Sequence, residues 1–155
     1  YYEVDNHGIL TFCNESLSTI IERPKTQMIG NPVEHFLSMP AIHTLAEVGY
    51  ALAAAETGDL HMGVWAMRSA FRIDPESLNN LTLDARLEVI VKDLITEYVN
   101  DRQDTLAIVA REFMIASLYY LLGDNESAGK SLPVDDTDSS TKNLSRLIEH
   151  LQQDR

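Results

Sequence analysis

The stretch that decides the fold runs from Ala41 to Asp59 and reads AIHTLAEVGYALAAAETGD. Alanine and leucine, two of the strongest helix formers, recur through its first part, which predicts a helix that ends at Thr57. Gly58 is a good helix stop because glycine readily adopts the left-handed backbone conformation, and Asp59 can cap a following helix that ends near Phe71. The stretch therefore predicts two consecutive helices joined by a short turn.

Two further helices are expected between this pair and Gly123. The first starts near Thr82 or Asp84, and its apolar residues recur at helical spacing: Leu83, Leu87, Ile90, Val91, Leu94, Ile95 and Tyr98. A polar break at 100–102 separates it from the second, whose apolar positions are Leu106, Val109, Phe113, Leu118 and Leu121. Residues 40–123 thus predict four longer helices, arranged as a helical bundle or as an array of helical hairpins.

The N-terminal residues 1–37 predict a β-hairpin followed by short helices. Tyr1–Val4 and Ile9–Phe12 are rich in β-prone residues, and Asp5–Gly8 between them has the composition of a turn. Asn14 can cap a short helix that follows the second strand. The fold class predicted for the chain is therefore mainly α with a small N-terminal β-hairpin (α+β).

The chain changes character after residue 123. Residues 124–142 are rich in Ser, Asp, Thr and Gly, which predicts a flexible acidic linker behind a single globular domain formed by residues 1–123. Residues 143–155 predict an amphipathic helix with a narrow apolar stripe of Leu144, Leu147, Ile148 and Leu151. Three interpretations of this stripe stay open: it docks on the chain's own core, pairs with a second copy, or binds a partner.

The charge of the chain restricts its partners. The sequence has 24 acidic and 12 basic residues, a formal net charge of −12, and no Lys or Arg between Thr26 and Met67. Such a surface repels phosphate groups, so we expect no direct binding to nucleic acid and none to an anionic membrane surface. A protein partner with a basic surface would be attracted by the same field, although acidity also serves solubility alone. No apolar run is long enough to predict a membrane span, and we expect a cytoplasmic location.

No recognised catalytic or ligand-binding motif occurs in the sequence. It lacks the GxSxG nucleophile elbow, the GxxxxGK[ST] phosphate loop and the GxGxxG dinucleotide motif. Its five histidines are scattered, and its one cysteine, Cys13, lies in a predicted strand and is interpreted as a small apolar residue. We therefore predict no catalytic residue, no metal site and no cofactor, so the chain is expected to be non-enzymatic.

The order of residues in the N-terminal region resembles that of a known family. The region has, in order, a strand, a turn with Asp and Gly, a second strand, an Asn before helices, and an Ile-Gly step. The residues that carry this order are Val4-Asp5, Gly8-Ile9, Phe12, Asn14, Pro24, Met28-Ile29-Gly30 and Phe36. Residues 1–36 thereby resemble the first half of a PAS sensor domain, which implies a small molecule held beside the hairpin. Helical patterns stand where that family continues with long strands, so none of its binding residues is carried over.

A second resemblance concerns the first pair of longer helices. The spacing of the second helix of a tetratricopeptide repeat is matched by Gly58-Asp59, Ala70 and Asp74-Pro75. The first helix of that repeat is matched loosely by Tyr50, Ala51 and Ala54. Residues 44–77 thereby resemble a single tetratricopeptide-like helical hairpin, with Glu47 where that family has a large residue. The resemblance implies a hairpin whose apolar face is covered by its neighbours.

The leading hypothesis is a non-enzymatic acidic protein–protein interaction module, which acts as an adaptor, chaperone or inhibitor or forms a homodimer. The residues predicted to bind the partner are Tyr119, Tyr120, Leu144, Leu147, Ile148 and Leu151. One alternative is a PAS-like ligand-sensing regulatory domain. Another is an acidic inhibitor that imitates nucleic acid and captures a DNA-binding protein.

Overall fold

The computed structural model describes residues 2–20, 23–36, 39–79, 81–101 and 106–153. In chain order its elements are β1 (Tyr2–Val4), β2 (Leu10–Cys13), α1 (Glu15–Ile20), α2 (Lys25–Met28), α3 (Met39–Glu56), α4 (Leu60–Ile73), α5 (Ala85–Val99), α6 (Ile108–Leu121), α7 (Asn125–Ser131) and α8 (Ser139–Gln153). Short 3-10 turns lie at Val33–His35 and Pro75–Leu78. The prediction of a mainly α fold with a small N-terminal β-hairpin is confirmed. None of the described helices is long and apolar enough to cross a lipid bilayer.

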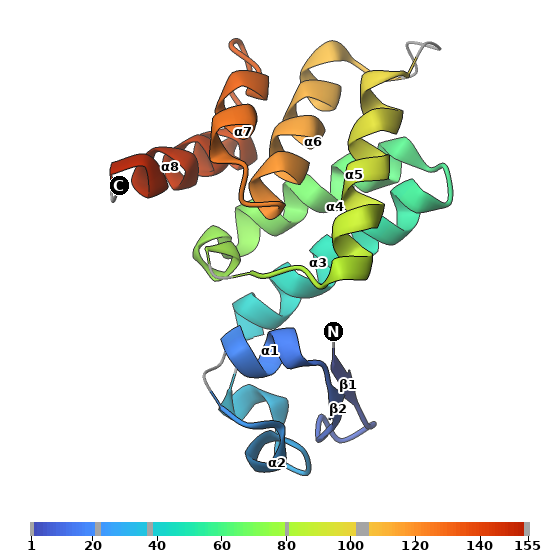
Figure 1. Cartoon of the computed structure of the whole chain (residues 1–155), viewed down its shortest axis with the longest axis vertical. Coiled ribbons are helices and arrows are strands. Elements are labelled where there is room, and N and C mark those ends of the chain that lie inside the picture. The colour runs from blue at the N-terminus through green and yellow to red at the C-terminus, as the bar shows by residue number, and fades with distance from the viewer. Residues whose placement is uncertain (1, 21–22, 37–38, 80, 102–105, 154–155) are drawn as a thin grey trace.

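Helices α3 to α8 form the larger part of the molecule, and the β-hairpin with α1 and α2 forms a smaller unit near the start of α3 (Figure 1). In the larger part, α3 packs along α4, α5 packs along α6 in the antiparallel direction, and α7 lies beside α6 (Figure 1). Helix α8 packs against α4 and α7. The four longer helices predicted for residues 40–123 correspond to α3, α4, α5 and α6.

The smaller unit has a hydrophobic cluster of its own. Strand β1 pairs antiparallel with β2, and the buried side chains around this hairpin are Leu10, Cys13, Leu17 and Met28. Asn14 accepts a hydrogen bond from the N–H of Leu17 at 3.0 Å, so the predicted cap starts α1 over this cluster. The single domain predicted for residues 1–123 is thus corrected in two respects: there are two hydrophobic clusters, and the larger one extends into α8.

The turn between α3 and α4 is formed by the glycine and aspartate that the sequence predicts. Gly58 has a φ of 90°, in the left-handed region, and Asp59 accepts the backbone N–H three residues later at 3.0 Å. The same two residue types join α6 to α7, where Gly123 has a φ of 75° and Asp124 accepts the N–H three residues later at 3.0 Å. Glycine reaches this conformation without steric strain, and the aspartate satisfies a free N–H of the next helix. Both connections therefore build a helical hairpin.

Residues 124–142 differ from the flexible acidic linker that was predicted. They contain α7 and the start of α8, and Ala128, Ser140 and Thr141 are buried. These buried side chains are small or polar, so their burial leaves no apolar periodicity in the sequence. The segment is fixed by polar contacts with α4, which composition alone does not reveal.

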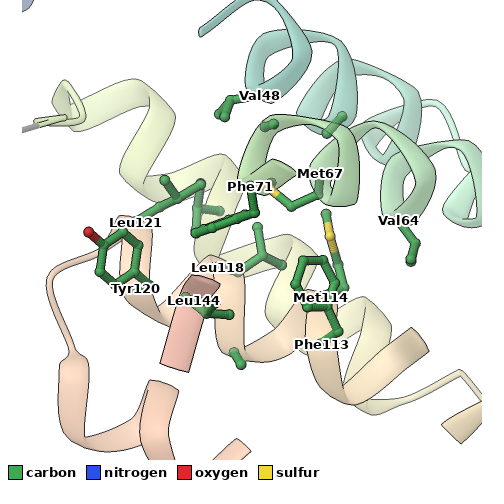
Figure 2. Packing of buried hydrophobic residues seen from close by; sticks show 14 of the residues in the cluster. Val48, Val64, Met67, Phe71, Phe113, Met114, Leu118, Tyr120, Leu121 and Leu144 are labelled. Atoms are coloured by element: carbon green, nitrogen blue, oxygen red, sulfur yellow. The ribbon is translucent and has the colours of Figure 1, made fainter. Parts of the chain in front are cut away.

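The larger hydrophobic cluster collects side chains from α3, α4, α6 and α8 (Figure 2). The ring of Phe71 in α4 meets the rings of Phe113 and Tyr120 in α6 edge-on, with ring centroids 5.9 Å apart in both pairs. Such pairs add about 0.5–1.5 kcal/mol to the stabilisation from burial. Helix α5 adds Val91, Leu94, Ile95 and Tyr98 to the same cluster, which therefore packs α5 against α3 and α6 against α4.

Candidate protein-binding groove

Four of the six residues predicted to bind a partner lie on α8. Leu144, Leu147 and Ile148 are only 0%, 2% and 3% exposed within the larger cluster, and Leu151 packs against it partly buried. Leu144, Leu147 and Ile148 thus belong to the core and offer no surface to a partner, which corrects their prediction, whereas Leu151 is half-buried at the edge of the core. Of the three interpretations of the stripe, docking on the chain's own core is the one found, because α8 buries its apolar face against the neighbouring helices.

The other two predicted residues, Tyr119 and Tyr120, point in different directions because they are adjacent in a helix. Tyr120 is buried and its hydroxyl donates to Oδ1 of Asn79 at 3.0 Å. Burial, with a smaller contribution from the charge of Glu76, raises the pKa of Tyr120 to about 12. Tyr120 is thus a core residue, whereas Tyr119 is half-buried and lines a groove.

Two arginines of α4 hold the segment that precedes α8. The guanidinium of Arg68 donates to the carboxylate of Asp136 at 2.7 Å and lies 4.3 Å from the ring centroid of Phe113. Arg72 donates through Nε to Asp138 at 3.2 Å. Because the side chains of Arg68 and Asp136 are only 14% and 10% exposed, solvent screens their attraction little. These contacts are structural, since they fasten the start of α8 to α4.

We expect this polar cluster to make the fold sensitive to acid. Burial acts to raise the pKa of Asp138, but hydrogen bonds from Arg72 and Ser140 outweigh it and hold that pKa well below its ordinary value. The pKa of Asp136 is also lowered overall. Burial acts to raise it, but hydrogen bonds and charges, those of Arg68 among them, outweigh burial. A lowered pKa contributes stability that is complete above the unfolded-state pKa of about 4 and is lost as pH falls through the folded-state value.

Urea denaturation between neutral pH and about pH 2 measures this contribution. Asp138→Asn keeps an acceptor for the N–H of Ser140 but removes the charge that Arg72 binds. It should lower the free energy of unfolding by about 1 kcal/mol at neutral pH and make the loss of stability below about pH 4 shallower. The control is Asp135→Asn, at an exposed neighbouring position. It should change neither the free energy of unfolding at neutral pH nor the loss of stability in acid. The prediction would be contradicted if the wild-type chain and Asp138→Asn lost the same stability in acid.

An open groove lies between α5 and the C-terminal end of α6. Its volume is about 440 Å³, and its lining residues are Glu88, Lys92, Ile95, Thr96, Tyr119, Leu122 and Asp124. The first four share one face of α5, because side chains three or four residues apart are neighbours on a helix. The other three come from the end of α6 and from the Gly-Asp turn that follows it.

The groove combines apolar surface with unequal charge. Ile95, which is 7% exposed, supplies apolar surface together with Tyr119 of α6 and Leu122, the residue that follows α6. Glu88 and Asp124 supply two carboxylates, and Lys92 supplies one ammonium, whose Nζ lies 3.5 Å from Oε2 of Glu88. Such a lining suits the apolar and cationic side chains of another polypeptide.

Tyr119 is the only lining residue that the sequence predicts to bind a partner. The apolar stripe of α5 includes Ile95, as predicted, but the stripe does not indicate which of its members border a groove. The sequence does contain a signal beside that stripe. Glu88, Lys92 and Thr96 recur every four residues, as expected for one exposed face of a helix.

Among the residues that the structure describes, no group of three His, Cys, Asp or Glu side chains is placed to hold a metal ion. Cys13 is buried in the smaller hydrophobic cluster, as a small apolar residue would be. Comparison of the chain with known protein families, with curated proteins and with solved structures found no match. The PAS and tetratricopeptide resemblances therefore stay predictions.

Proposed function

We propose that the chain is a non-enzymatic protein-interaction module that binds a segment of a protein partner in the groove between α5 and α6. Such a module would act as an adaptor, chaperone or inhibitor. The observation that carries the proposal is the groove itself, where apolar and charged side chains line about 440 Å³ of open volume. Protein interfaces combine the same features, with aromatic and apolar groups at the centre and a polar rim.

The platform around the groove supports this proposal. The hydroxyl of Tyr98, at the end of α5, donates to the carbonyl oxygen of Leu60 in α4 at 3.1 Å. Helix α6 is held against α4 by the contacts of Phe71 with Phe113 and Tyr120. The α5 wall is thus held by packing on α3 and by this hydrogen bond to α4, and the α6 wall is held by packing on α4. A preformed surface loses less conformational entropy when a partner binds.

Thr96→Trp should block the groove without unfolding the chain. Thr96 is exposed, and its hydroxyl donates to the carbonyl oxygen of Lys92 at 3.2 Å, so the free energy of unfolding should change by less than about 0.5 kcal/mol. The indole ring would fill the groove and lower the affinity for synthetic amphipathic helical peptides of about 15 residues at least tenfold. Chemical shifts of the Ile95 and Leu122 methyl groups report binding during the titration.

The matched control is Val89→Trp. Val89 is 57% exposed on α5 but does not line the groove, so an indole ring there should leave peptide affinity unchanged. Equal peptide affinity of Val89→Trp and Thr96→Trp would show that the groove is not the binding site. The proposal would also be wrong if no peptide shifted the Ile95 and Leu122 signals at millimolar concentration.

Native mass spectrometry separates this proposal from two competing ones. A ligand-sensing domain would retain a small molecule beside the N-terminal hairpin, and Thr96→Trp would not release it. A dimer that Thr96→Trp converts to monomers would instead assign the groove to a second copy of the chain.

A further inference from the structure

We infer that the partner segment is a basic amphipathic helix. Its apolar stripe would face Ile95, Tyr119 and Leu122, and a Lys or Arg would lie at the end of the groove formed by Glu88 and Asp124. The inference rests on the proposed function, because it assigns the chemistry of the segment that the groove binds.

The two ends of the groove differ in charge. Helices α5 and α6 run antiparallel, so Glu88, near the start of α5, lies at the same end as Asp124, which follows the end of α6 (Figure 1). Ile95 lies about two helical turns further along α5. A segment in the groove therefore meets the two carboxylates beside Leu122 at one end, and Tyr119 and Ile95 further along.

The charged end retains a net negative charge. Lys92 and Glu88 are 61% and 48% exposed, and at 3.5 Å their pairing is weak and screened by solvent. The N–H of Ser127 donates to Asp124 at 3.0 Å, which lowers the pKa of Asp124 and keeps it ionised at neutral pH. The lining thus has two carboxylates and one ammonium, and the chain's net charge of −12 attracts a cationic segment over a longer range.

The dimensions of the groove favour a short helix. From Glu88 to Thr96 helix α5 rises about 12 Å, since each residue adds about 1.5 Å. Val99, one turn beyond Thr96 on the same face, is 57% exposed and extends the apolar surface. A helix of two to three turns matches this length and can present apolar side chains at i, i+3, i+4 and i+7 to the groove.

The test uses the full chain and two synthetic peptides of about 15 residues. Both have the same leucine stripe, but one has Lys and the other Glu at the polar positions. We expect the Lys peptide to bind at least about tenfold more tightly than the Glu peptide at low salt. Combining Glu88→Gln with Asp124→Asn should weaken binding of the Lys peptide about fivefold, because both charges are lost while Asn still caps α7.

The matched control combines Asp93→Asn with Glu97→Gln. It removes two charges from exposed positions of α5 outside the groove lining and should change the affinity less than about twofold. Equal losses in the two double variants would overturn the inference, since general charge would then attract the peptide. Equal affinity for both peptides, with Ile95 and Leu122 still shifting, would overturn it too but leave the proposed function intact. No shift with either peptide would overturn both.

Discussion

Leu147→Asp is expected to lower the free energy of unfolding by more than about 4 kcal/mol, because it places a carboxylate in the larger hydrophobic cluster. Leu147 is 2% exposed, and burial of a leucine side chain alone contributes about 1.5–3 kcal/mol. The unpaired buried charge adds several kcal/mol. Because a domain is stable by only about 5–15 kcal/mol, much of this chain would have α8 detached or be unfolded entirely. Urea denaturation followed by circular dichroism measures the loss.

Lys142→Asp is the control for this variant. It introduces the same carboxylate into α8, but at an exposed position in the first turn, where the helix dipole favours negative charge. Its free energy of unfolding should stay within about 0.5 kcal/mol of the wild-type value. If Leu147→Asp unfolded at the same urea concentration as Lys142→Asp, α8 would not be part of the core in solution. The stripe of α8 would then be available to a partner after all.

Gly63→Ala should lower the free energy of unfolding by about 2 kcal/mol, although alanine is the better helix former. A Cβ atom at this position would lie 2.6 Å from the hydroxyl of Tyr98, 3.0 Å from Cβ of Ala55 and 3.2 Å from the carbonyl oxygen of Ala51. Helices α3, α4 and α5 therefore meet at Gly63. Because 2.6 Å is too close for a Cβ, the hydroxyl of Tyr98 must shift, and we expect this to weaken its hydrogen bond to Leu60. Overpacking and the weakened bond together outweigh the helix-propensity gain of about 1 kcal/mol.

Two further variants make this prediction specific. Gly49→Ala, in α3, meets no atom within 4 Å and should stabilise the chain by about 0.5–1 kcal/mol. Tyr98→Phe removes the hydroxyl oxygen, the atom closest to the new Cβ. It should therefore lower the free energy of unfolding less in the Gly63→Ala background than in the wild-type chain. Thermal and urea denaturation of the four chains give the coupling energy. Stabilisation of Gly63→Ala by as much as Gly49→Ala would show that the three helices do not approach so closely in solution.

The two Gly-Asp turns show how far local sequence predicts this fold. At Gly58-Asp59 the surrounding helical patterns are strong, so the stop and the cap were both recognised. Gly123-Asp124 contains the same chemistry, but the helix that follows has mostly small and polar residues, and that composition predicts a linker. Periodicity detects a helix only when its buried face is apolar. The turn itself was the better signal for α7.

The candidate site depends on contacts that local patterns do not contain. Arg68 and Asp136 form their ion pair across 68 positions of the chain, and this pair helps decide that α8 docks on the core. The groove arises because the start of α5 and the end of α6 lie side by side, with α5 packed on α3 and α6 packed on α4. Helix geometry predicts that at least one of the adjacent residues Tyr119 and Tyr120 is partly exposed, but it does not indicate which, and the structure shows that it is Tyr119.

The separate N-terminal cluster gives the molecule a hierarchy of cooperative units. This unit buries only four side chains in its own cluster, with Tyr2, Val33 and Phe36 partly buried against them, so we expect it to be less stable than the helical part. The helical part can therefore stay folded while the hairpin opens. Amides of β2 would thus exchange with solvent through local opening, and those of α4 and α6 only through global unfolding.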